Sequence, residues 1–306
     1  MNPYPSYDTG MTVSGGTVSV GGTVTAVGHD ERDPARTGPS RRETWDQAGR
    51  SADVGVLTVL REEMVAVVEV LRRAPDHRTE RMRGGASVHR ATFAAEGGPV
   101  RVVATQTLEP GTHSAALAYQ QLRRYFRPPL VLLVGIAGGV RADLAVGDVV
   151  LSDEVIWYDS RRESAGGPRR RGRIQATAPV LRRRVSDFLV RRGTVVRPQP
   201  GQEFHIHRGP IGSGNAVVTD SGSAIRSWLA ETHETLAVET EAAGLAQAFY
   251  EEVDEDDGLR GWMTVRGISD RADRHGGHAD HGLAARHAAL VMERLLPHLC
   301  LIEDER

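Results

Sequence analysis

The sequence predicts an α/β protein: a single three-layer domain whose central twisted sheet is mixed, largely parallel and flanked by helices, preceded by a flexible tail. Apolar runs suited to buried strands alternate with stretches of helical periodicity along most of the 306 residues, a pattern typical of sheets with crossover helices. Residues 1–51 are instead rich in Gly, Ser, Thr and Pro. Such a segment cannot bury enough apolar surface to offset its ordering entropy. We therefore expect a tail over residues 1–51 and a folded domain over residues 52–306.

The folded part is expected to begin with a buried strand at residues 54–59, a continuous apolar run. A helix should follow at residues 62–72, because Met64, Val67 and Leu71 recur at helical spacing. The same criteria predict the later elements in order: paired strands at 86–94 and 100–105, a helix at 114–125, a central strand at 130–136, a strand at 148–157, a helix at 178–191, strands at 211–218 and 237–239, a helix at 241–250, a strand at 263–268 and a helix at 283–296.

The tail contains an imperfect repeat in which Val and Thr recur with Gly at a six-residue step over residues 14–28. One interpretation is a flexible tail or a lone hairpin. The other is a self-assembly motif over residues 11–28, because short, uncharged, proline-free, β-prone segments suit cross-β assembly. The stretch resembles the short amyloid-signalling tails of some bacterial and fungal immune effectors.

Composition and charge restrict the expected binding partners of the protein and its expected cellular compartment. The net charge of -2 gives no basic field to attract nucleic acid. The longest apolar run, residues 129–140, is broken by glycines and too short to cross a membrane. With no signal peptide at the N-terminus and only Cys300, which leaves no internal disulfide, the sequence indicates a cytoplasmic protein. All 38 basic residues are arginines, so lysine chemistry is excluded.

Four separated stretches are predicted to form one pocket: residues 55–63, 134–139, 238–244 and 265–270. Each places an acid or a glycine turn where an apolar strand run meets a helix-like run. In open α/β sheets, ligands bind at that junction. In this order and spacing, the four stretches resemble the nucleoside phosphorylase / methylthioadenosine–adenosylhomocysteine nucleosidase superfamily, over roughly residues 53–301. The resemblance implies cleavage of a purine–ribose bond by a homodimer, with no metal or organic cofactor.

Asp270 is the candidate catalytic acid. It follows Ser269 at the end of an apolar strand, where partial burial favours the protonated form of a carboxyl group. The resemblance assigns the Asp of this Ser-Asp pair to the purine N7, where it would assist the leaving base. The alternative interpretation is an aspartate that caps the following segment.

Glu241 is the candidate ribose ligand, because a carboxylate can accept hydrogen bonds from the 2′- and 3′-hydroxyls. The superfamily signature Glu-Met-Glu-Ala stands here as Glu239-Thr240-Glu241-Ala242. Thr240 replaces a methionine that packs on the sugar, and we expect both Glu239 and Thr240 at the substrate. The alternative for Glu241 is an acidic helix start favoured by the macrodipole.

Glu63 determines the expected nucleophile. In the nucleosidase branch, the last Glu of the acidic run after the first strand activates the attacking water, and Arg61-Glu62-Glu63 stands at that place. The phosphorylase branch has a Gly-Asp-Pro loop with an Arg there, and a second Arg where this chain has Leu133. Without those arginines a phosphate dianion has no evident seat, so hydrolysis is predicted over phosphorolysis. The alternative for Glu63 is again a favourable charge at a helix start.

Further substrate contacts are expected from the backbone and from ring side chains. The glycine turn should bring Ala137 and Gly138 against the base or sugar. By resemblance, the residues just after the strand at 209–215, including Val217 and Val218, hold the purine through backbone groups, and the loop with His113 lies near the ribose 5′ substituent; the alternative for His113 is a simply exposed side chain. Val217 stands where bacterial nucleosidases have an aromatic ring, so base stacking must come from elsewhere, and Phe204 is the nearest candidate. His205 and His207 flank Phe204, but no Cys or carboxylate is spaced to complete a metal site.

The predicted function is hydrolysis of the N-glycosidic bond of adenine nucleosides or nucleotides, releasing adenine and a ribosyl product. The tail repeat and the inserted arginines at 169–171 favour a nucleotide-depleting defence effector. These arginines are interpreted either as a solvated loop or as a clamp on substrate phosphates. The alternatives are a methylthioadenosine/adenosylhomocysteine salvage nucleosidase, a phosphate-dependent purine nucleoside phosphorylase and a non-catalytic nucleotide sensor.

Overall fold

The computed structural model describes residues 12–14, 17–19 and 52–299, with gaps at 96, 166, 168, 221, 253–260 and 273–279. The chain divides into two compact units, residues 1–44 and 45–306. In the first unit, β1 (Thr12–Ser14) and β2 (Thr17–Ser19) form an antiparallel pair with Val13 opposite Val18. The rest of the segment 11–28 lies outside the described residues, and its self-assembly stays a prediction.

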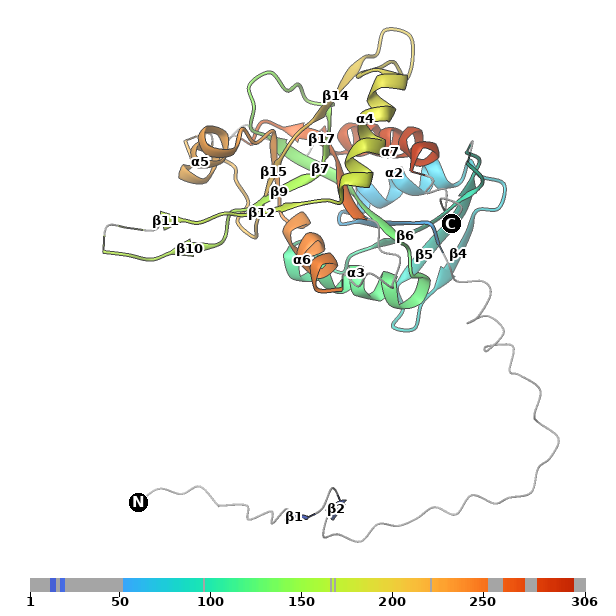
Figure 1. The fold of residues 1–306 in the computed structure, drawn as a ribbon. Helices are drawn as coiled ribbons and strands as arrows, with labels where there is room; N and C mark the ends of the chain where they lie inside the picture. The colour runs from blue at the N-terminus through green and yellow to red at the C-terminus, as the bar shows by residue number, and fades with distance from the viewer. Residues whose placement is uncertain are drawn as a thin grey trace, which may run out of the picture. The chain divides into compact units, whose positions relative to one another are not determined.

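The second unit confirms the predicted α/β fold and is built on one mixed sheet (Figure 1). Its central strand is β7 (Leu130–Gly139), which pairs in parallel with β17 (Gly261–Asp270) on one side. On its other side, β7 pairs in parallel with β3 (Val54–Thr58) along its first half and antiparallel with β16 (Ala237–Glu239) at its last residues. Parts of three of the four predicted pocket stretches, 134–139, 238–244 and 265–270, therefore meet at the carboxyl end of β7.

The sheet runs in the order β12-β9-β15-β16-β7-β17-β8-β14-β13, and β6, β5 and β4 continue it outward from β3. Pairing is parallel between β3 and β6, β9 and β15, β15 and β16, and β8 and β14, and antiparallel between β8 and β17 and toward the edges. These strands are β4 (Arg78–Arg81), β5 (Ser87–Phe93), β6 (Val100–Gln106), β8 (Val149–Ser152), β9 (Glu154–Trp157), β12 (Arg173–Ala176), β13 (Val195–Val196), β14 (Phe204–Arg208) and β15 (Ile211–Ser213).

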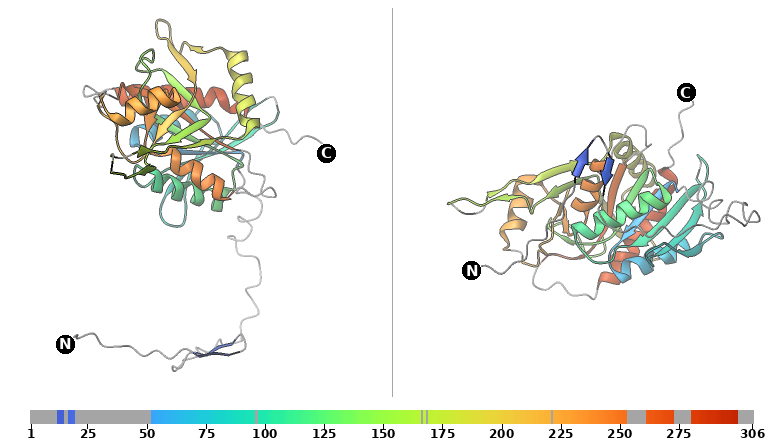
Figure 2. Two further views of the ribbon diagram at one scale, coloured as in Figure 1. Left: turned by 60° about the vertical axis from the view of Figure 1, so that its left-hand side comes forward. Right: turned by 90° about the horizontal axis from the view of Figure 1, so that it is seen from below.

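Helices cover both faces of the sheet and complete the three layers (Figures 1 and 2). On one face α2 (Arg61–Leu71) packs on α7 (His281–Leu295), and on the other α3 (Thr112–Phe126) packs on α6 (Ala242–Glu252). Alternate side chains of β7 point to opposite faces of the sheet. Leu132 packs in the core under α2 and α7, whereas Leu133 packs in the core under α3 and α6. The remaining helices among the described residues are α4 (Pro179–Arg192), α5 (Ala224–His233) and the short 3₁₀ helix η3 (Leu296–His298).

None of the helices in the described ranges is long and apolar enough to cross a membrane.

Two strand predictions were wrong in extent. Residues 148–157 form two strands that occupy different places in the sheet, β8 and β9, and Asp153 separates them. Its buried carboxylate accepts hydrogen bonds from Arg182 and Arg208, which a continuous apolar strand could not accommodate. The predicted strand at 211–218 stops at Ser213, since the backbone beyond it turns away to contact other loops.

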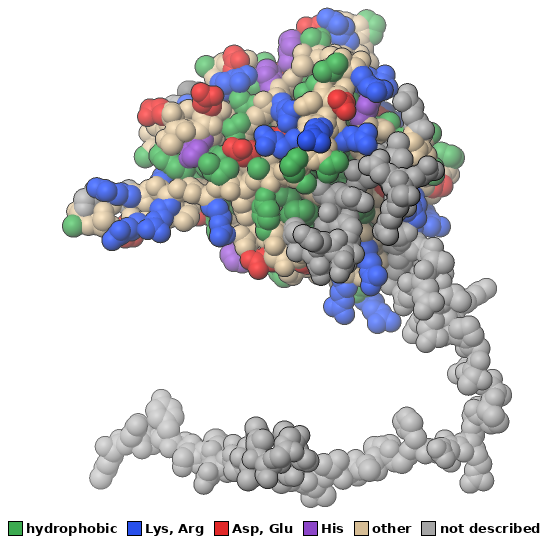
Figure 3. All heavy atoms as spheres, viewed as in Figure 1, with side chains coloured by type: hydrophobic (Ala, Val, Ile, Leu, Met, Phe, Trp, Pro, Cys, Tyr) green, Lys and Arg blue, Asp and Glu red, His purple; other side chains and the backbone are tan. Residues whose placement is uncertain are grey.

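The inserted basic segment forms a hairpin. β10 (Arg161–Arg162) pairs antiparallel with β11 (Arg169–Arg170), and the chain then enters β12. We call residues 161–171 the arginine arm. Figure 1 shows the arm projecting from the sheet at β9 and β12, and Figure 3 shows its arginine side chains spread over its surface.

Candidate active site

A fully buried arginine joins three of the four predicted stretches. The Arg266 side chain, from β17, is 0% exposed and lies among the carboxylates of Glu63, Glu239 and Glu241. Its Nη2 donates hydrogen bonds to Glu239 Oε2 and, over 3.1 Å, to Glu241 Oε2. Its Nη1 lies 3.8 Å from Glu63 Oε1. These four side chains form what we call the Arg266 cluster.

Glu63 lies in the first turn of α2 and turns back toward the sheet. Its Oε2 accepts hydrogen bonds from the backbone N–H groups of Val59 (2.7 Å) and Leu60 (2.8 Å), and its Oε1 accepts one from Ile136 (2.8 Å). Burial raises the pKa of Glu63, although Arg266 and these N–H donors oppose the shift. Glu63 therefore caps α2, a contact that was not predicted from the sequence, and also presents an oriented, basic carboxylate to the cluster.

The glycine turn of β7 makes room for the cluster. A Cβ atom on Gly135 would lie 2.2 Å from Glu63 Oε1 and 2.4 Å from Arg266 Nη1. Any side chain at this position would separate the two charged groups. Gly135 thus has a definite steric role at this point of the strand.

Glu239 is buried and contacts the start of α6. Its two oxygens accept hydrogen bonds from the backbone N–H of Ala242 (3.1 and 3.0 Å) at the start of α6, and Oε2 also accepts one from Glu241 (3.1 Å). Burial raises the pKa of Glu239 against the opposing charge of Arg266. Glu239 thus links the start of α6 to Arg266, and its contact with a substrate stays a prediction.

Glu241 faces the loop before α3. Its Oε1 accepts hydrogen bonds from the backbone N–H of Gly111 (3.0 Å) and from the hydroxyl of Thr240. Together with Arg266 on Oε2, these contacts use three of the roughly four acceptor positions of a carboxylate. Glu241 retains capacity for one more donor, such as a hydroxyl group.

Arg266 was absent from the residues predicted to act, although the sequence carries a signal for it. The residue interrupts the otherwise apolar strand run at 261–270, and a buried arginine requires anionic partners. Burial by itself lowers the pKa of Arg266, but the three surrounding glutamates raise it by more. The net shift of the pKa is therefore upward, and the side chain stays charged. The Arg266 guanidinium group is thus the shared cationic partner of three buried carboxylates.

Asp270 lies at the end of β17, opposite Gly138 of β7, after a register irregularity that follows Ile268. Its Oδ2 accepts a hydrogen bond from the Ser269 hydroxyl (2.8 Å), and its Oδ1 accepts one from the backbone N–H of Ala272 (2.7 Å). The carboxylate is partly exposed. The structure thus contains the capping contact, and it also places a hydrogen-bonded carboxyl at the same strand ends as the Arg266 cluster.

A chain of polar contacts leads from Glu241 to the foot of the arginine arm. Thr112, next to Gly111, donates hydrogen bonds from its N–H (3.2 Å) and hydroxyl (3.1 Å) to Asn215 Oδ1. Asn215 in turn donates from its N–H (2.8 Å) and its Nδ2 (3.0 Å) to Asp159 Oδ2. Asp159 precedes β10, so the arm begins beside the loop that the sequence assigns to purine binding.

The remaining predicted contacts lie around this chain of contacts. Val217 is 75% exposed in the loop after β15, whereas Val218 is buried in a small apolar cluster with Tyr158. His113 is exposed in the first turn of α3. Ala137 is buried in β7, and its carbonyl accepts a weak hydrogen bond from Ser269 (3.4 Å). The substrate contacts of all these residues stay predictions.

Phe204 does not join this group. It begins β14, is 3% exposed in the hydrophobic core, and its ring stacks on His287 of α7 with 4.0 Å between ring centroids. Its ring face is therefore already covered, and the proposal that it stacks on a purine is corrected. Sequence proximity to the glycine-rich strand suggested the role, but the alternation of β14 directs the ring into the core.

Within the described residues, no three His, Cys, Asp or Glu side chains are grouped to hold a metal ion. The site's chemistry is that of buried carboxylates around one arginine, beside a partly exposed aspartate.

Fold and site together define the class. The family model of the phosphorylase superfamily matches residues 53–300, so the chain belongs to that superfamily, as the resemblance of the four stretches predicted. Among its relatives is the ATP nucleosidase Cap17 of Escherichia coli strain KTE188, 26% identical over an alignment of 263 residues that covers 79% of this chain and 50% of that protein. The chain thus spans about half the length of Cap17.

Two further similarities follow the same pattern. A 5′-methylthioadenosine/S-adenosylhomocysteine nucleosidase of Haemophilus influenzae strain PittEE is 27% identical over 197 residues, covering 64% of this chain and 79% of that enzyme. The native structure of the futalosine hydrolase of Helicobacter pylori strain 26695 superposes with a TM-score of 0.63 at 19% identity, covering 79% of this chain and 96% of that one. The latter similarity supports the fold.

Proposed function

We propose that the protein hydrolyses the N-glycosidic bond of an adenine nucleoside or nucleotide. One observation carries the proposal: Arg266 Nη1, a buried donor without a hydrogen-bond acceptor among the described residues, lies 3.8 Å from Glu63 Oε1. A water molecule can accept from the guanidinium and donate to the carboxylate at such a place. The names of the relatives, all adenine nucleosidases, agree with this chemistry.

In the proposed reaction, the water oxygen forms a bond to the anomeric carbon while the bond from that carbon to the purine nitrogen breaks. Glu63 takes a proton from the water, and its raised pKa makes it a stronger base once ionised. The electron pair of the broken bond passes to the purine, which Asp270 protonates or hydrogen-bonds at N7. Glu241 accepts a hydrogen bond from the ribose, whose ring carries oxocarbenium character in the transition state.

Hydrolysis is favoured over phosphorolysis by the charge of the site. Arg266 is shared among Glu63, Glu239 and Glu241, so it offers no spare positive charge to a phosphate dianion. Leu133, where the phosphorylase branch has an arginine, is fully buried in the core.

We infer further that the preferred substrate carries phosphates and that the arginine arm contacts them. The exposed guanidinium groups of Arg162, Arg169 and Arg171 are suited to phosphate oxygens. At the foot of the arm, Asp159 connects through Asn215 to Thr112, adjacent to the residue that contacts Glu241. A nucleotide-depleting activity follows from this assignment, whereas a salvage nucleosidase has no need of the arm.

The test is product analysis with adenosine, methylthioadenosine, adenosylhomocysteine, AMP and ATP, each with and without inorganic phosphate. We expect free adenine without phosphate, fastest from ATP. Replacing Arg162, Arg169 and Arg171 together with serine should lower kcat/KM for ATP about tenfold or more, since each lost charge-assisted contact costs roughly 1.5–3 kcal/mol. The same variant should have an unchanged kcat/KM for methylthioadenosine. Arg81, Arg83 and Arg183, exposed elsewhere, provide a matched triple-serine control.

Each alternative has its own outcome. Adenine released only with phosphate would identify a phosphorylase and contradict the role of Glu63. Equal turnover of ATP and methylthioadenosine, or an arm variant with full ATP activity, would reject the phosphate assignment and favour salvage. Binding without base release from any substrate would identify a sensor.

We also infer a homodimer formed through the face beside the site. Large apolar side chains are exposed there, Leu108 at 93%, Leu117 at 61% and Val217 at 75%, on segments that adjoin the contact between Thr112 and Asn215. Light scattering should give the mass of two chains for a protein lacking residues 11–28. If the tail assembles, the full chain should form larger species that this deletion abolishes. A monomeric mass for the shortened protein would contradict the dimer.

A further inference from the structure

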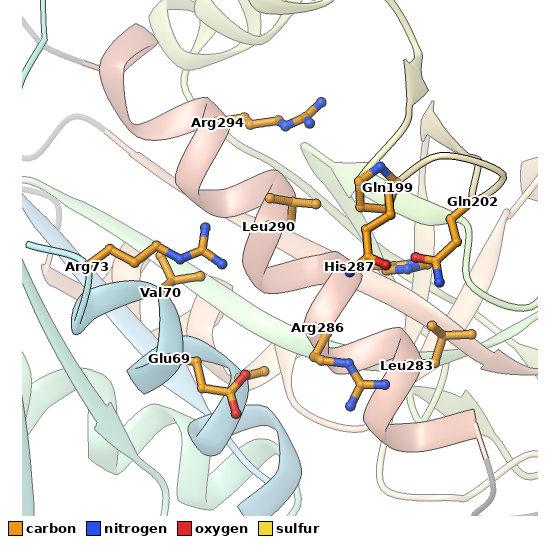
Figure 4. Close-up of a pocket in the computed structure, with 12 residues that line it drawn as sticks. Glu69, Val70, Arg73, Gln199, Gln202, Leu283, Arg286, His287, Leu290 and Arg294 are labelled. Carbon is orange, nitrogen blue, oxygen red and sulfur yellow. The ribbon is translucent and has the colours of Figure 1, made fainter.

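A hollow outside the candidate active site crosses the outer face of α7. Its volume is about 470 Å³, within the size range of small-molecule sites. Figure 4 shows Arg286, Leu290 and Arg294 along α7, with Arg73, just beyond the end of α2, on one side and Gln199 on the other. The hollow thus joins two helices and the loop that connects β13 to β14.

The walls provide a mixed chemistry. Val70, Leu283 and Leu290 contribute apolar surface, and the side chains of Gln199 and Gln202 contribute amide groups. Such a combination of apolar floor and a few polar groups is typical of sites that hold an organic ligand.

Positive side chains outnumber acidic ones in the lining of the hollow. Arg73, Arg286 and Arg294 line it, against a single acid, Glu69. Arg73 is already paired with Glu293 (2.5 Å). Arg286 and Arg294 have neither a hydrogen-bond acceptor nor a salt-bridge partner within the described chain. Two guanidinium groups without a partner on one hollow favour an anion, because an anion matches their fork of N–H donors.

The spacing favours an extended anion. Arg286 and Arg294 are eight positions apart on α7, which is about 12 Å along a helix axis. A ligand with linked phosphates can contact both guanidinium groups more readily than a single phosphate ion can. An attached base would then reach the apolar floor and the two glutamine amides.

We propose that this hollow binds a small molecule carrying linked phosphates, of nucleotide size, at a site separate from the Arg266 cluster. The ligand would bridge α2 and α7. Glu63 lies at the start of α2, and α7 follows the segment that begins at Asp270, so a bound ligand would clamp the two helices that adjoin the catalytic residues. The binding itself does not depend on the proposed hydrolysis.

The test is calorimetric titration of the full-length Asp270→Asn protein, which should leave nucleotides intact, with ADP and separately with inorganic tripolyphosphate. We expect two ADP sites per chain. Adding Arg286→Ala and Arg294→Ala should remove one of them or raise its dissociation constant roughly tenfold or more. The control pair Arg81→Ala and Arg183→Ala should keep both sites. Because all four arginines are exposed, unchanged melting temperatures without ligand will show that each variant folds.

The two probes separate the sources of the affinity. Tighter binding of ADP than of tripolyphosphate at this site would show that the hollow also contacts the adenosine part of the ligand. Equal affinity for both would show that it recognises the phosphates alone. ADP binding whose number of sites and dissociation constants stay the same after the loss of Arg286 and Arg294 overturns the proposal. A change of oligomeric mass in the double variant without a change in binding also overturns it, because the hollow would then be an interface. Adenine release by the unmodified protein is measured independently, so failure here leaves the proposed function untouched.

Discussion

Replacing Arg266 with methionine is expected to destabilise the folded domain by about 3–5 kcal/mol and to abolish turnover. The substitution leaves Glu63, Glu239 and Glu241 buried without their shared cation, and removing one partner of a buried ion pair carries a cost of this size. Urea unfolding of both proteins at several pH values measures the difference. The exposed pair Arg197–Glu203 provides the control, because Arg197→Met should change stability by no more than about 1 kcal/mol.

The loss of stability in the Arg266→Met protein should increase as the pH rises. Burial raises the pKa of Glu63 and Glu239 in the folded state above the ordinary glutamate value of about 4.3, and the loss of Arg266 removes the charge that opposes this shift. A group with a raised folded pKa favours folding below its unfolded pKa and loses that contribution as the pH rises. The Arg266→Met protein should therefore approach the wild type in acid and fall behind it above about pH 4.

Two outcomes would contradict this account. Equal unfolding midpoints for Arg266→Met and the wild type at neutral pH would show that the cluster is not electrostatically coupled. Adding Glu239→Gln to the Arg266→Met protein should recover part of the lost stability, because it removes one uncompensated carboxylate. If the double variant is no more stable than Arg266→Met, the destabilisation does not come from uncompensated carboxylates.

Asp270→Asn is expected to lower kcat by roughly 10²–10⁴-fold, the usual contribution of a general acid, while the protein keeps its fold. Asparagine has the same shape, its oxygen can still accept from the N–H of Ala272, and its amide can donate to the Ser269 hydroxyl. It cannot supply the proton that the leaving purine requires. Steady-state kinetics of adenine release measure the change, and thermal unfolding checks the fold.

Asp143→Asn is the matched control, because Asp143 is exposed and paired only with Arg141 among the contacts that the structure gives. It should leave kcat unchanged. A decrease of less than about threefold in Asp270→Asn would reject the role of Asp270 as the acid and leave the capping contact as its function. A wild type without turnover, in which Asp270→Asn only weakens nucleotide binding, would identify a sensor.

The predictions that succeeded depended on short-range patterns. Continuous apolar runs located β3, β7 and β17 within one to three residues at each end, since a strand covered on both faces must be apolar along its length. The wrong strand ends at 148–157 and 211–218 have the opposite cause. There Asp153 and Asn215 take up contacts with residues remote in sequence, and local propensity carries no signal of such partners.

Sequence by itself determined the class of fold, the superfamily and the candidate acids Glu63, Glu241 and Asp270, because periodicity and motif order can be read along one chain. Only the tertiary structure decided which charges meet. Arg266 pairs with Glu239 and Glu241 across 27 and 25 positions, and Phe204 turns into the core against His287. The reason is physical: a charge in a strand needs a partner, but which acid neutralises it depends on how the sheet brings distant strand ends together.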